Sequence, residues 1–244
     1  MKKNILVLGA AGRIGLSLVK NLANKNFNII AVDKETNELK LLKFKNIIIK
    51  KIDLTKIEKF EKFLHNEIKF AIDTIIYAAY PQSKNWNKKK KTLNFKELCD
   101  NFILQLALPL KLSEIIIKYF LKKKKGNLIH ISSILGVRSP KFEHYVGTSV
   151  NNNIEYTVIK SGIISLTQYL AKKYMKKNIR VNCVSPGGIY DGQDKKFVKK
   201  YQKSCGKKGL LSANDLNGVF EFLISEKSRY INGQNLIVDD GWSL

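Results

Sequence analysis

Seven short runs rich in Ile, Val and Leu recur along this chain, and most are separated by segments with the periodicity of helices. The first such segment has apolar residues at Ile14, Leu18 and Leu22. Continuous apolar strands that alternate with helices are typical of a parallel sheet covered on both sides. The pattern therefore predicts an α/β fold, a doubly wound parallel sheet of about seven strands with helices on both faces. The predicted strands are Asn4–Leu8, Asn28–Val32, Asn46–Ile52, Thr74–Ala78, Asn127–Ser132, Arg180–Val184 and Asn235–Val238.

The chain has 244 residues and neither an internal repeat nor a Pro/Gly/Ser-rich linker, so we expect residues 1–244 to form a single domain. Its three cysteines are scattered and form no Cys-x-x-Cys pair, which argues against a disulfide framework or a cysteine-based metal site. The basic start and the apolar stretch at 5–11 lack a small-residue cleavage site, and no apolar run approaches the ~20 residues that span a bilayer. We therefore expect a cytoplasmic protein without a membrane segment.

The net charge of +24, from 44 Lys and Arg against 20 Asp and Glu, raises the question of a nucleic-acid partner. Only four of the basic residues are arginines, and the lysines are spread along the whole chain. Sequence-reading proteins favour Arg because its planar fork pairs with guanine and phosphate. We therefore expect no specific nucleic-acid binding, only salt-dependent attraction to polyanions. The run Lys88–Lys91 near a ligand-side loop either favours an anionic substrate or is a solvated surface.

A glycine-rich turn follows the first predicted strand and leads into the first helix. Glycines there let the backbone approach a pyrophosphate, whose charge the helix N-terminal amides stabilise. The second strand is followed by Asp33, which can accept hydrogen bonds from ribose hydroxyls and would repel a 2′-phosphate. This predicts a Rossmann-like site for NAD, with NADP possible because Arg13 and Lys34 are close by. The predicted turn residues are Gly9, Gly12, Arg13, Ile14 and Gly15; packing of helix on strand is the alternative role of the glycines.

The segment Tyr156–Lys160 opens a helical stretch that runs to about residue 176. Spacing of i, i+4 places the phenol and the ammonium on one helix face. A nearby positive charge stabilises phenolate and is expected to bring the pKa of Tyr156 from ~10 toward neutrality. Tyr156 is therefore a candidate general acid/base. By itself the spacing is common, and a half-buried Tyr beside a solvated Lys is the alternative.

Taken together and in order, these motifs resemble those of the short-chain dehydrogenase/reductase family, across essentially the whole chain. Within this family, Tyr80-Pro81 and the segment 139–149 resemble a bacterial subgroup associated with flagellin modification or surface-sugar biosynthesis. The other matching elements are the glycine-rich turn, Asp33, Asp53-Leu54, Ile131-Ser132-Ser133, Tyr156–Lys160, Arg180-Val181-Asn182, Ser185–Gly188, Asn232-Gly233-Gln234 and Val238–Gly241.

The resemblance implies a role for each matching residue. Ser133 would hydrogen-bond the substrate oxygen, Tyr156 would give or take its proton, and Lys160 would lower the pKa of Tyr156 and hold the nicotinamide ribose. The reaction would be NAD(P)-dependent interconversion of a carbonyl and a secondary alcohol. The resemblance also implies a homo-oligomer, a dimer or a tetramer, with helices at about 95–121 and 156–176 between subunits. Further implied cofactor contacts are Asp53, Leu54, Ala78, Ala79, Tyr156, Pro186, Gly187 and Ile189.

The chain departs from the family pattern at several positions. The usual Asn-Asn-Ala-Gly after the fourth strand is replaced by Tyr77–Tyr80. The family's active-site Asn aligns with Gln105, whereas Asn101 lies one helical turn earlier, so either could take its place. Ser133 and Tyr156 are 23 positions apart, about ten more than is usual, and the intervening segment 134–155 is either a substrate-recognition loop or a surface elaboration.

These observations predict an enzyme whose small-molecule substrate is polar or anionic, and sugar-derived, from surface-glycan or flagellin-glycan biosynthesis. A 3-oxoacyl-acyl-carrier-protein reductase is the nearest alternative, since such a carrier is acidic and this chain is basic. A regulatory protein that binds the cofactor without catalysis is the second, suggested by the replaced Asn. No metal site is expected.

Overall fold

The computed structural model describes residues 3–68, 70–84, 86 and 94–244. Seven parallel strands form one sheet in the order β3-β2-β1-β4-β5-β6-β7, which confirms the predicted fold class. Each predicted strand is present, and the ends agree to within two residues. The strands are β1 Asn4–Leu8, β2 Asn28–Asp33, β3 Ile47–Lys51, β4 Thr74–Tyr77, β5 Gly126–Ile131, β6 Ile179–Pro186 and β7 Asn235–Val238.

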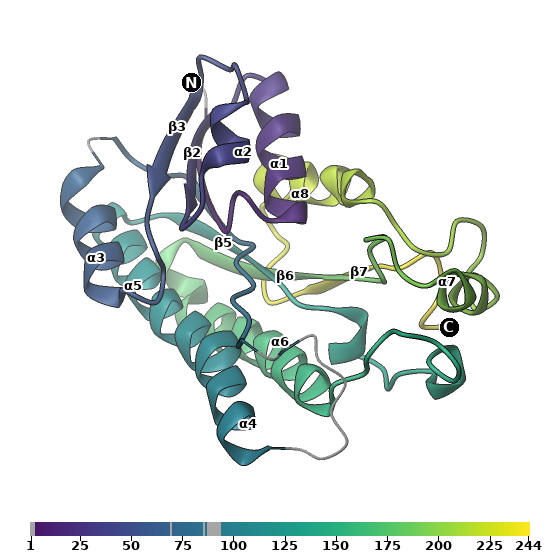
Figure 1. Ribbon diagram of the computed structural model, residues 1–244. Coiled ribbons are helices and arrows are strands. Elements are labelled where there is room, and N and C mark those ends of the chain that lie inside the picture. Colours follow the sequence, from purple (N-terminus) through teal and green to yellow (C-terminus); the bar gives the residue numbers. More distant parts are fainter. Residues whose placement is uncertain (1–2, 69, 85, 87–93) are drawn as a thin grey trace.

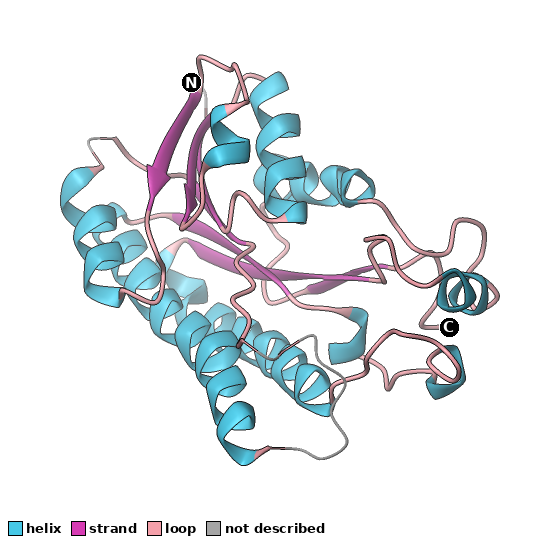
Figure 2. Ribbon diagram, in the orientation of Figure 1, coloured by secondary structure: helices cyan, strands magenta, loops and turns pink. Residues whose placement is uncertain are grey.

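Helices cover both faces of the sheet (Figures 1 and 2). Helices α1 and α8 pack on one face, and α3, α5 and α6 pack on the other. The helices are α1 Arg13–Asn24, α2 Asn37–Lys40, α3 Ile57–Lys62, α4 Phe95–Phe102, α5 Leu108–Lys123, α6 Ile154–Tyr174, α7 Lys195–Gln202 and α8 Asn217–Ile224. The predicted helix at 95–121 is interrupted by a π-helical turn, Ile103–Ala107, between α4 and α5.

The strand order reverses at β1, which pairs with β2 on one side and with β4 on the other. The segment that follows β2 packs on one face of the sheet, and the segment that follows β4 packs on the other. A crevice therefore opens between them, beyond the carboxyl ends of the strands. The glycine-rich turn follows β1 at this point. The strand order alone therefore places the candidate site at this crevice.

A third apolar cluster lies apart from the two faces of the sheet. It joins α7 to the chain's C-terminal end and to the segment 134–155, which contains short 3-10 turns at Ile134–Gly136 and Phe142–His144. Its buried members are Ile134, Phe197, Tyr201, Leu210 and Trp242. In Figure 1 these segments lie together beyond the β7 end of the sheet. The insert is thus packed against the body of the protein through apolar side chains.

One buried histidine makes the stability of the fold depend on pH. His130 in β5 is hydrogen-bonded to Ser113 (2.9 Å) and Thr167 (2.8 Å), and burial, together with the Lys160 charge, lowers its pKa to about 4. The folded protein therefore binds fewer protons than the unfolded chain below about pH 6.5, so this part of the stability is lost as the pH falls. In urea unfolding, the free energy of unfolding of the wild type should be about 2 kcal/mol lower at about pH 5 than at pH 7. Most of this loss should be absent in His130→Asn; an identical loss in the variant would exclude His130 as its origin.

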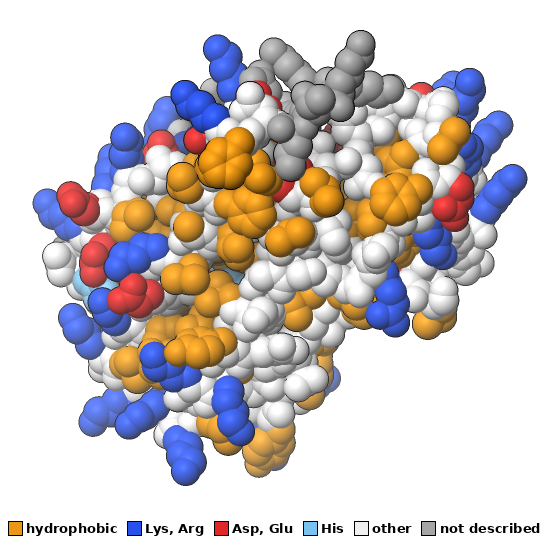
Figure 3. All heavy atoms as spheres, turned by 90° about the horizontal axis from the view of Figure 1, so that it is seen from below, with side chains coloured by type: hydrophobic (Ala, Val, Ile, Leu, Met, Phe, Trp, Pro, Cys, Tyr) orange, Lys and Arg blue, Asp and Glu red, His pale blue; other side chains and the backbone are white. Residues whose placement is uncertain are grey.

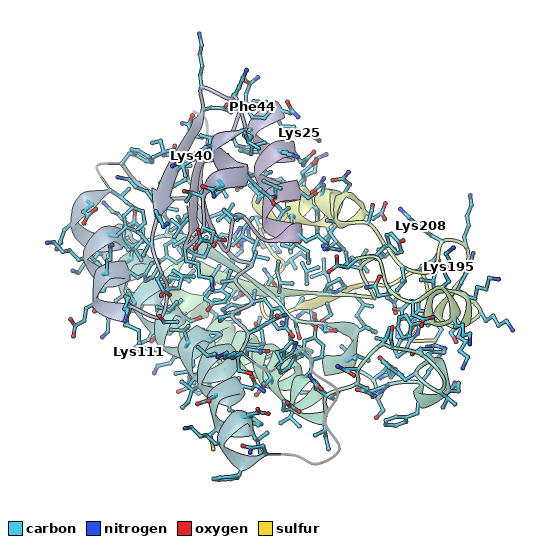
Figure 4. All side chains as sticks on the ribbon, viewed as in Figure 1. Lys25, Lys40, Phe44, Lys111, Lys195 and Lys208 are labelled. Carbon is cyan, nitrogen blue, oxygen red and sulfur yellow. The ribbon has the colours of Figure 1, made fainter. Side chains whose placement is uncertain are left out.

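The lysines behind the high net charge come from many different elements. Figure 4 labels Lys25 after α1, Lys40 in α2, Lys111 in α5, Lys195 in α7 and Lys208 beyond it, all around the periphery. Within the described part of the chain, no helix is both long and apolar enough to cross a membrane. The run Lys88–Lys91 lies outside the described residues.

Candidate active site

A cavity of about 880 Å³ lies beyond the carboxyl ends of the strands. It brings together residues that are far apart in the sequence. Two predicted site residues, Gly15 and Gln105, do not line it. Those that do are Gly9, Gly12, Arg13, Ile14, Asp33, Asp53, Leu54, Ala78, Ala79, Ser133, Tyr156, Lys160, Pro186, Gly187 and Ile189.

The glycine-rich turn beside the cavity requires glycine at two positions. Gly9 has φ +79°, and a Cβ there would lie 2.4 Å from the Cα of Ala79, at the end of the neighbouring β4. A Cβ on Gly15 would lie 2.1 Å from the carbonyl oxygen of Gly9, so this glycine allows α1 to start close to the turn. No side chain at Gly9 therefore separates the end of β1 from the end of β4, and the first residues of α1 line the crevice beside it.

Two charged residues flank the glycine-rich turn. Asp33 ends β2, and its carboxylate accepts hydrogen bonds from the backbone N–H of Ala11 (2.9 Å) and of Glu35 (3.2 Å). Arg13 opens α1 and reaches across the cavity mouth, where it donates to the carbonyl of Tyr190 (2.7 Å) and pairs with Asp191. Asp33 is thus fixed beside the turn, while Arg13 connects the turn to the loop after β6.

Ser133, Tyr156 and Lys160 meet at the centre of the cavity. Tyr156 and Ser133 line the same cavity, and the Ser133 side chain acts to lower the pKa of Tyr156; the Ser133 hydroxyl also accepts the N–H of Leu135 (3.2 Å). The Lys160 ammonium lies 5.5 Å from the centre of the Tyr156 ring and donates to the carbonyl of Ile131 (3.3 Å). The neighbouring Ser132 is buried and donates to the Lys160 carbonyl (2.7 Å), so it fixes the helix.

The expected lowering of the Tyr156 pKa is not found in the protein alone. Burial raises the pKa of Tyr156 above its ordinary value and outweighs the opposing effect of the Ser133 side chain. The same burial lowers the pKa of Lys160 to about 8, because it disfavours the ammonium. The prediction neglected desolvation, which acts on both members of the pair.

Gln105 and Asn101 lie in the helical stretch behind the site. Gln105 is at the middle of the π-helical turn and is 4% exposed, and neither polar atom of its amide has a partner in the described part of the chain. Asn101 is fully buried and donates to Glu155 (3.2 Å). π-Helical turns are frequent at functional sites. No residue pattern in the sequence indicated this turn.

The two ends of the cavity differ in chemistry. Among the described lining residues, the charged ones other than Lys160 lie near the ends of β1, β2 and β3; they are Arg13, Asp33, Lys34, Glu35 and Asp53. The opposite end carries neutral polar and aromatic side chains from the loop after β4, the insert, the loop after β6, α7 and the C-terminal end. They include Tyr80, Gln82, Ser83, Tyr145, Gln193, Phe197, Tyr201 and Trp242.

Comparison with known proteins agrees with this geometry. A family model described as enoyl-(acyl carrier protein) reductase matches residues 9–243. A post-translational flagellin modification protein A from Campylobacter coli is 39% identical over 99% of this chain and 98% of that protein. The chain is a short-chain dehydrogenase/reductase. The predicted family resemblance, including its flagellin-modification subgroup, is confirmed at the level of similarity.

Other members of the family cover the same length. A 3-oxoacyl-[acyl-carrier-protein] reductase from Buchnera aphidicola is 28% identical over 98% of this chain and 97% of that protein. The crystal structure of a short-chain dehydrogenase from Leptospira borgpetersenii with bound NAD⁺ has a TM-score of 0.89 and 28% identity. It covers all of this chain and 94% of that one.

The sequence did not indicate the aromatic lining of this short-chain dehydrogenase/reductase. Tyr145 was recognised only as part of the insert, yet its ring packs on Phe197 with a centroid distance of 5.3 Å. Tyr201 stacks on Trp242 and accepts the backbone N–H of Gly188 (2.7 Å). In the sequence these aromatic residues lie far apart, between Tyr145 and Trp242, and no local pattern shows that they share one cavity.

Proposed function

We propose that this NAD(P)-dependent oxidoreductase interconverts a carbonyl and a secondary alcohol on a sugar-derived substrate, in the biosynthesis of a surface or flagellin glycan. The observation that carries the proposal is the convergence of Ser133, Tyr156 and Lys160 on one cavity. That cavity continues into a glycine-rich crevice of the kind that receives a dinucleotide. The similarity to a flagellin modification protein supports the choice of pathway.

The described residues fit a nicotinamide dinucleotide. Without a side chain at Gly9, a pyrophosphate can approach the first backbone amides of α1, which have no partner within the helix, and Asp33 is held where it can accept ribose hydroxyls. Asp53 and Leu54 lie beyond β3 for the adenine, and Pro186, Gly187 and Ile189 follow β6 for the nicotinamide. When bound, the cofactor supplies or accepts the hydride. Binding of NAD⁺ by the Leptospira relative supports this assignment.

The protein's own residues move the proton. Ser133 holds the substrate oxygen, and Tyr156 donates a proton to it in reduction or removes one in oxidation. The Ser133 side chain acts to lower the pKa of Tyr156 against the effect of burial, and the Lys160 ammonium adds a positive charge beside the ring. We assign Gln105, which aligns with the family's active-site Asn, a positioning role, since its buried and otherwise unpartnered amide can hold a hydrogen-bonded relay.

The aromatic end of the cavity supports a ring-shaped polar substrate. The aromatic rings of Tyr145, Phe197 and Trp242 can stack on the C–H faces of a sugar ring. The side-chain amides of Gln82 and Gln193 can form hydrogen bonds with its hydroxyls. Apart from Lys160, the charged residues described in the cavity serve the cofactor end, which supports a substrate that is neutral and polar where it meets the aromatic end. The similarity to an acyl-carrier-protein reductase keeps an acyl thioester as the second candidate.

Turnover of a substrate panel tests the proposal. Free, phosphorylated and nucleotide-linked keto- and hydroxy-sugars are incubated with NADH or NAD⁺, and the nicotinamide absorbance is followed. Acetoacetyl thioester serves as the comparison substrate. We expect a sugar to be turned over well above the thioester. Preference for the thioester would establish the acyl-reductase alternative, and no turnover despite NADH binding would favour a regulatory role.

Cofactor preference gives a separate prediction at Asp33. A carboxylate beside the ribose repels a 2′-phosphate, so NADH should bind more tightly than NADPH by about 10-fold. Asp33→Asn removes the charge and should reduce this preference to about 2-fold or less, mainly by improving NADPH binding. Fluorescence titration of both variants with both cofactors measures the effect. Tighter binding of NADPH by wild type would contradict the assignment.

We also propose that the whole chain works as one domain in the cytoplasm and assembles into a dimer or tetramer. Exposed apolar side chains support the assembly, because they gather on the face formed by α4, α5 and α6 (Figure 3). Such patches on a protein surface often mark interfaces. On these helices they are Phe95, Leu110, Leu121, Ile154, Val158, Tyr169 and, after the end of α6, Met175, with Ile103 in the π-helical turn.

A further inference from the structure

Tyr80 lies where the family pattern ends in glycine, and its ring contacts the catalytic pair. The Lys160 ammonium lies 5.1 Å from the centre of the Tyr80 ring and 5.5 Å from the centre of the Tyr156 ring. The two rings meet edge to face, with centroids 5.9 Å apart and planes at 78°. The ammonium therefore lies against two aromatic rings, one of which belongs to a residue that the family resemblance does not assign.

The surroundings of the Lys160 ammonium are otherwise poor at stabilising charge. Lys160 is 8% exposed, and the carbonyl of Ile131 accepts its hydrogen bond at 3.3 Å. The titratable groups that face it are Cys183 in β6, whose interaction favours the ammonium, His130 in β5 and the Tyr156 phenol. A desolvated cation gains more from a ring face than an exposed one.

Tyr80 is itself held in place. Its ring meets that of Trp86 edge to face, with the ring centroids 5.9 Å apart and the planes at 87°. The Trp86 carbonyl accepts the side-chain amide of Asn153 (3.1 Å), at the residue preceding α6. The ring on Lys160 is thus tied to the start of the helix that carries Tyr156 and Lys160.

We propose that Tyr80 is a positioning residue, whose ring face holds the Lys160 ammonium beside Tyr156 through a cation–π contact. This rests on the proposed function of Lys160. The contact keeps the lysine charged and in place before the cofactor arrives. The aromatic face carries the effect, so phenylalanine can replace Tyr80, whereas an aliphatic residue cannot.

Competitive acetylation of the ligand-free protein tests the proposal without turnover. Wild type, Tyr80→Phe, Tyr80→Leu and Tyr80→Met are labelled with acetic anhydride between about pH 6 and pH 10, and the peptide with Lys160 is quantified by mass spectrometry. We expect the apparent pKa of Lys160 to fall by about one unit in Tyr80→Leu and Tyr80→Met, and to stay near the wild-type value in Tyr80→Phe. Methionine keeps most of the side-chain volume in case leucine disturbs the fold.

The same digest contains a matched control. Lys173, also on α6, lies 5.6 Å from the exposed ring of Tyr169, and its labelling should not change in any Tyr80 variant. NADH titration at about pH 8 should show several-fold weaker binding by the aliphatic variants, because more Lys160 is neutral there. An unchanged Lys160 pKa in a folded aliphatic variant would overturn the proposal, as would equal shifts in Tyr80→Phe and Tyr80→Leu. Loss of turnover in Lys160→Met alongside such a result would leave the proposed function standing.

Discussion

Replacing Tyr156 by phenylalanine should lower kcat by about 10³-fold, measured on the substrate that the panel identifies. The variant retains the ring that Lys160 and Tyr80 contact, but it loses the hydroxyl that we propose as the proton donor and acceptor. A positioned general acid/base contributes about 10²–10⁴-fold to rate, so its removal should remove this share. NADH should still bind, because the glycine-rich turn, Asp33 and Lys160 are unchanged, and the loss of one buried hydroxyl should lower the free energy of unfolding by only about 1 kcal/mol.

Two further variants make the result specific. Tyr169→Phe removes an exposed phenol from the same helix and should turn over at the wild-type rate. Ser133→Ala should lower kcat by about 10²-fold, since it removes the partner that orients the substrate oxygen. Wild-type activity in Tyr156→Phe would refute the role of this hydroxyl as the proton donor. A large loss of NADH binding would instead point to a structural effect.

The fold could be predicted because its signals are local. Continuous apolar strands, a glycine-rich turn and helical periodicity each occupy fewer than about 20 neighbouring residues. Right-handed crossovers then leave few arrangements of a parallel sheet. The same locality explains why Gly9, Asp33 and the Tyr156–Lys160 pair were found: each follows a strand or opens a helix.

The parts of the site that were missed depend on contacts between distant segments. The Tyr80 ring meets Lys160 across 80 positions, and Tyr201 stacks on Trp242 through α7 and the C-terminal end. The π-helical turn around Gln105 also has no composition of its own. The direction of the Tyr156 pKa was wrong for a related reason: spacing placed a lysine beside the phenol but did not show how deeply both are buried.

Replacing Gly9 by alanine should destabilise the protein and distort the crevice where we propose that the dinucleotide binds. The new Cβ would lie 2.4 Å from the Cα and 2.5 Å from the N of Ala79, both backbone atoms that cannot rotate away. The residue would also keep a positive φ of 79°. Overpacking and backbone strain each cost about 1–3 kcal/mol, so we expect a loss of about 2–5 kcal/mol in the free energy of unfolding. NADH binding should weaken by at least about 10-fold, because β1 and β4 must move apart where the pyrophosphate binds.

Gly147→Ala separates the two causes. Gly147 has a similar φ of +71°, but a Cβ there meets no atom within 4 Å. The free energy of unfolding of this variant should therefore fall by only about 1 kcal/mol, and the variant should bind NADH as tightly as wild type does. Urea unfolding and NADH titration of both proteins give the comparison. If Gly9→Ala is no less stable than Gly147→Ala and binds NADH equally well, the ends of β1 and β4 can separate freely, and close backbone approach is not what makes this crevice a dinucleotide site.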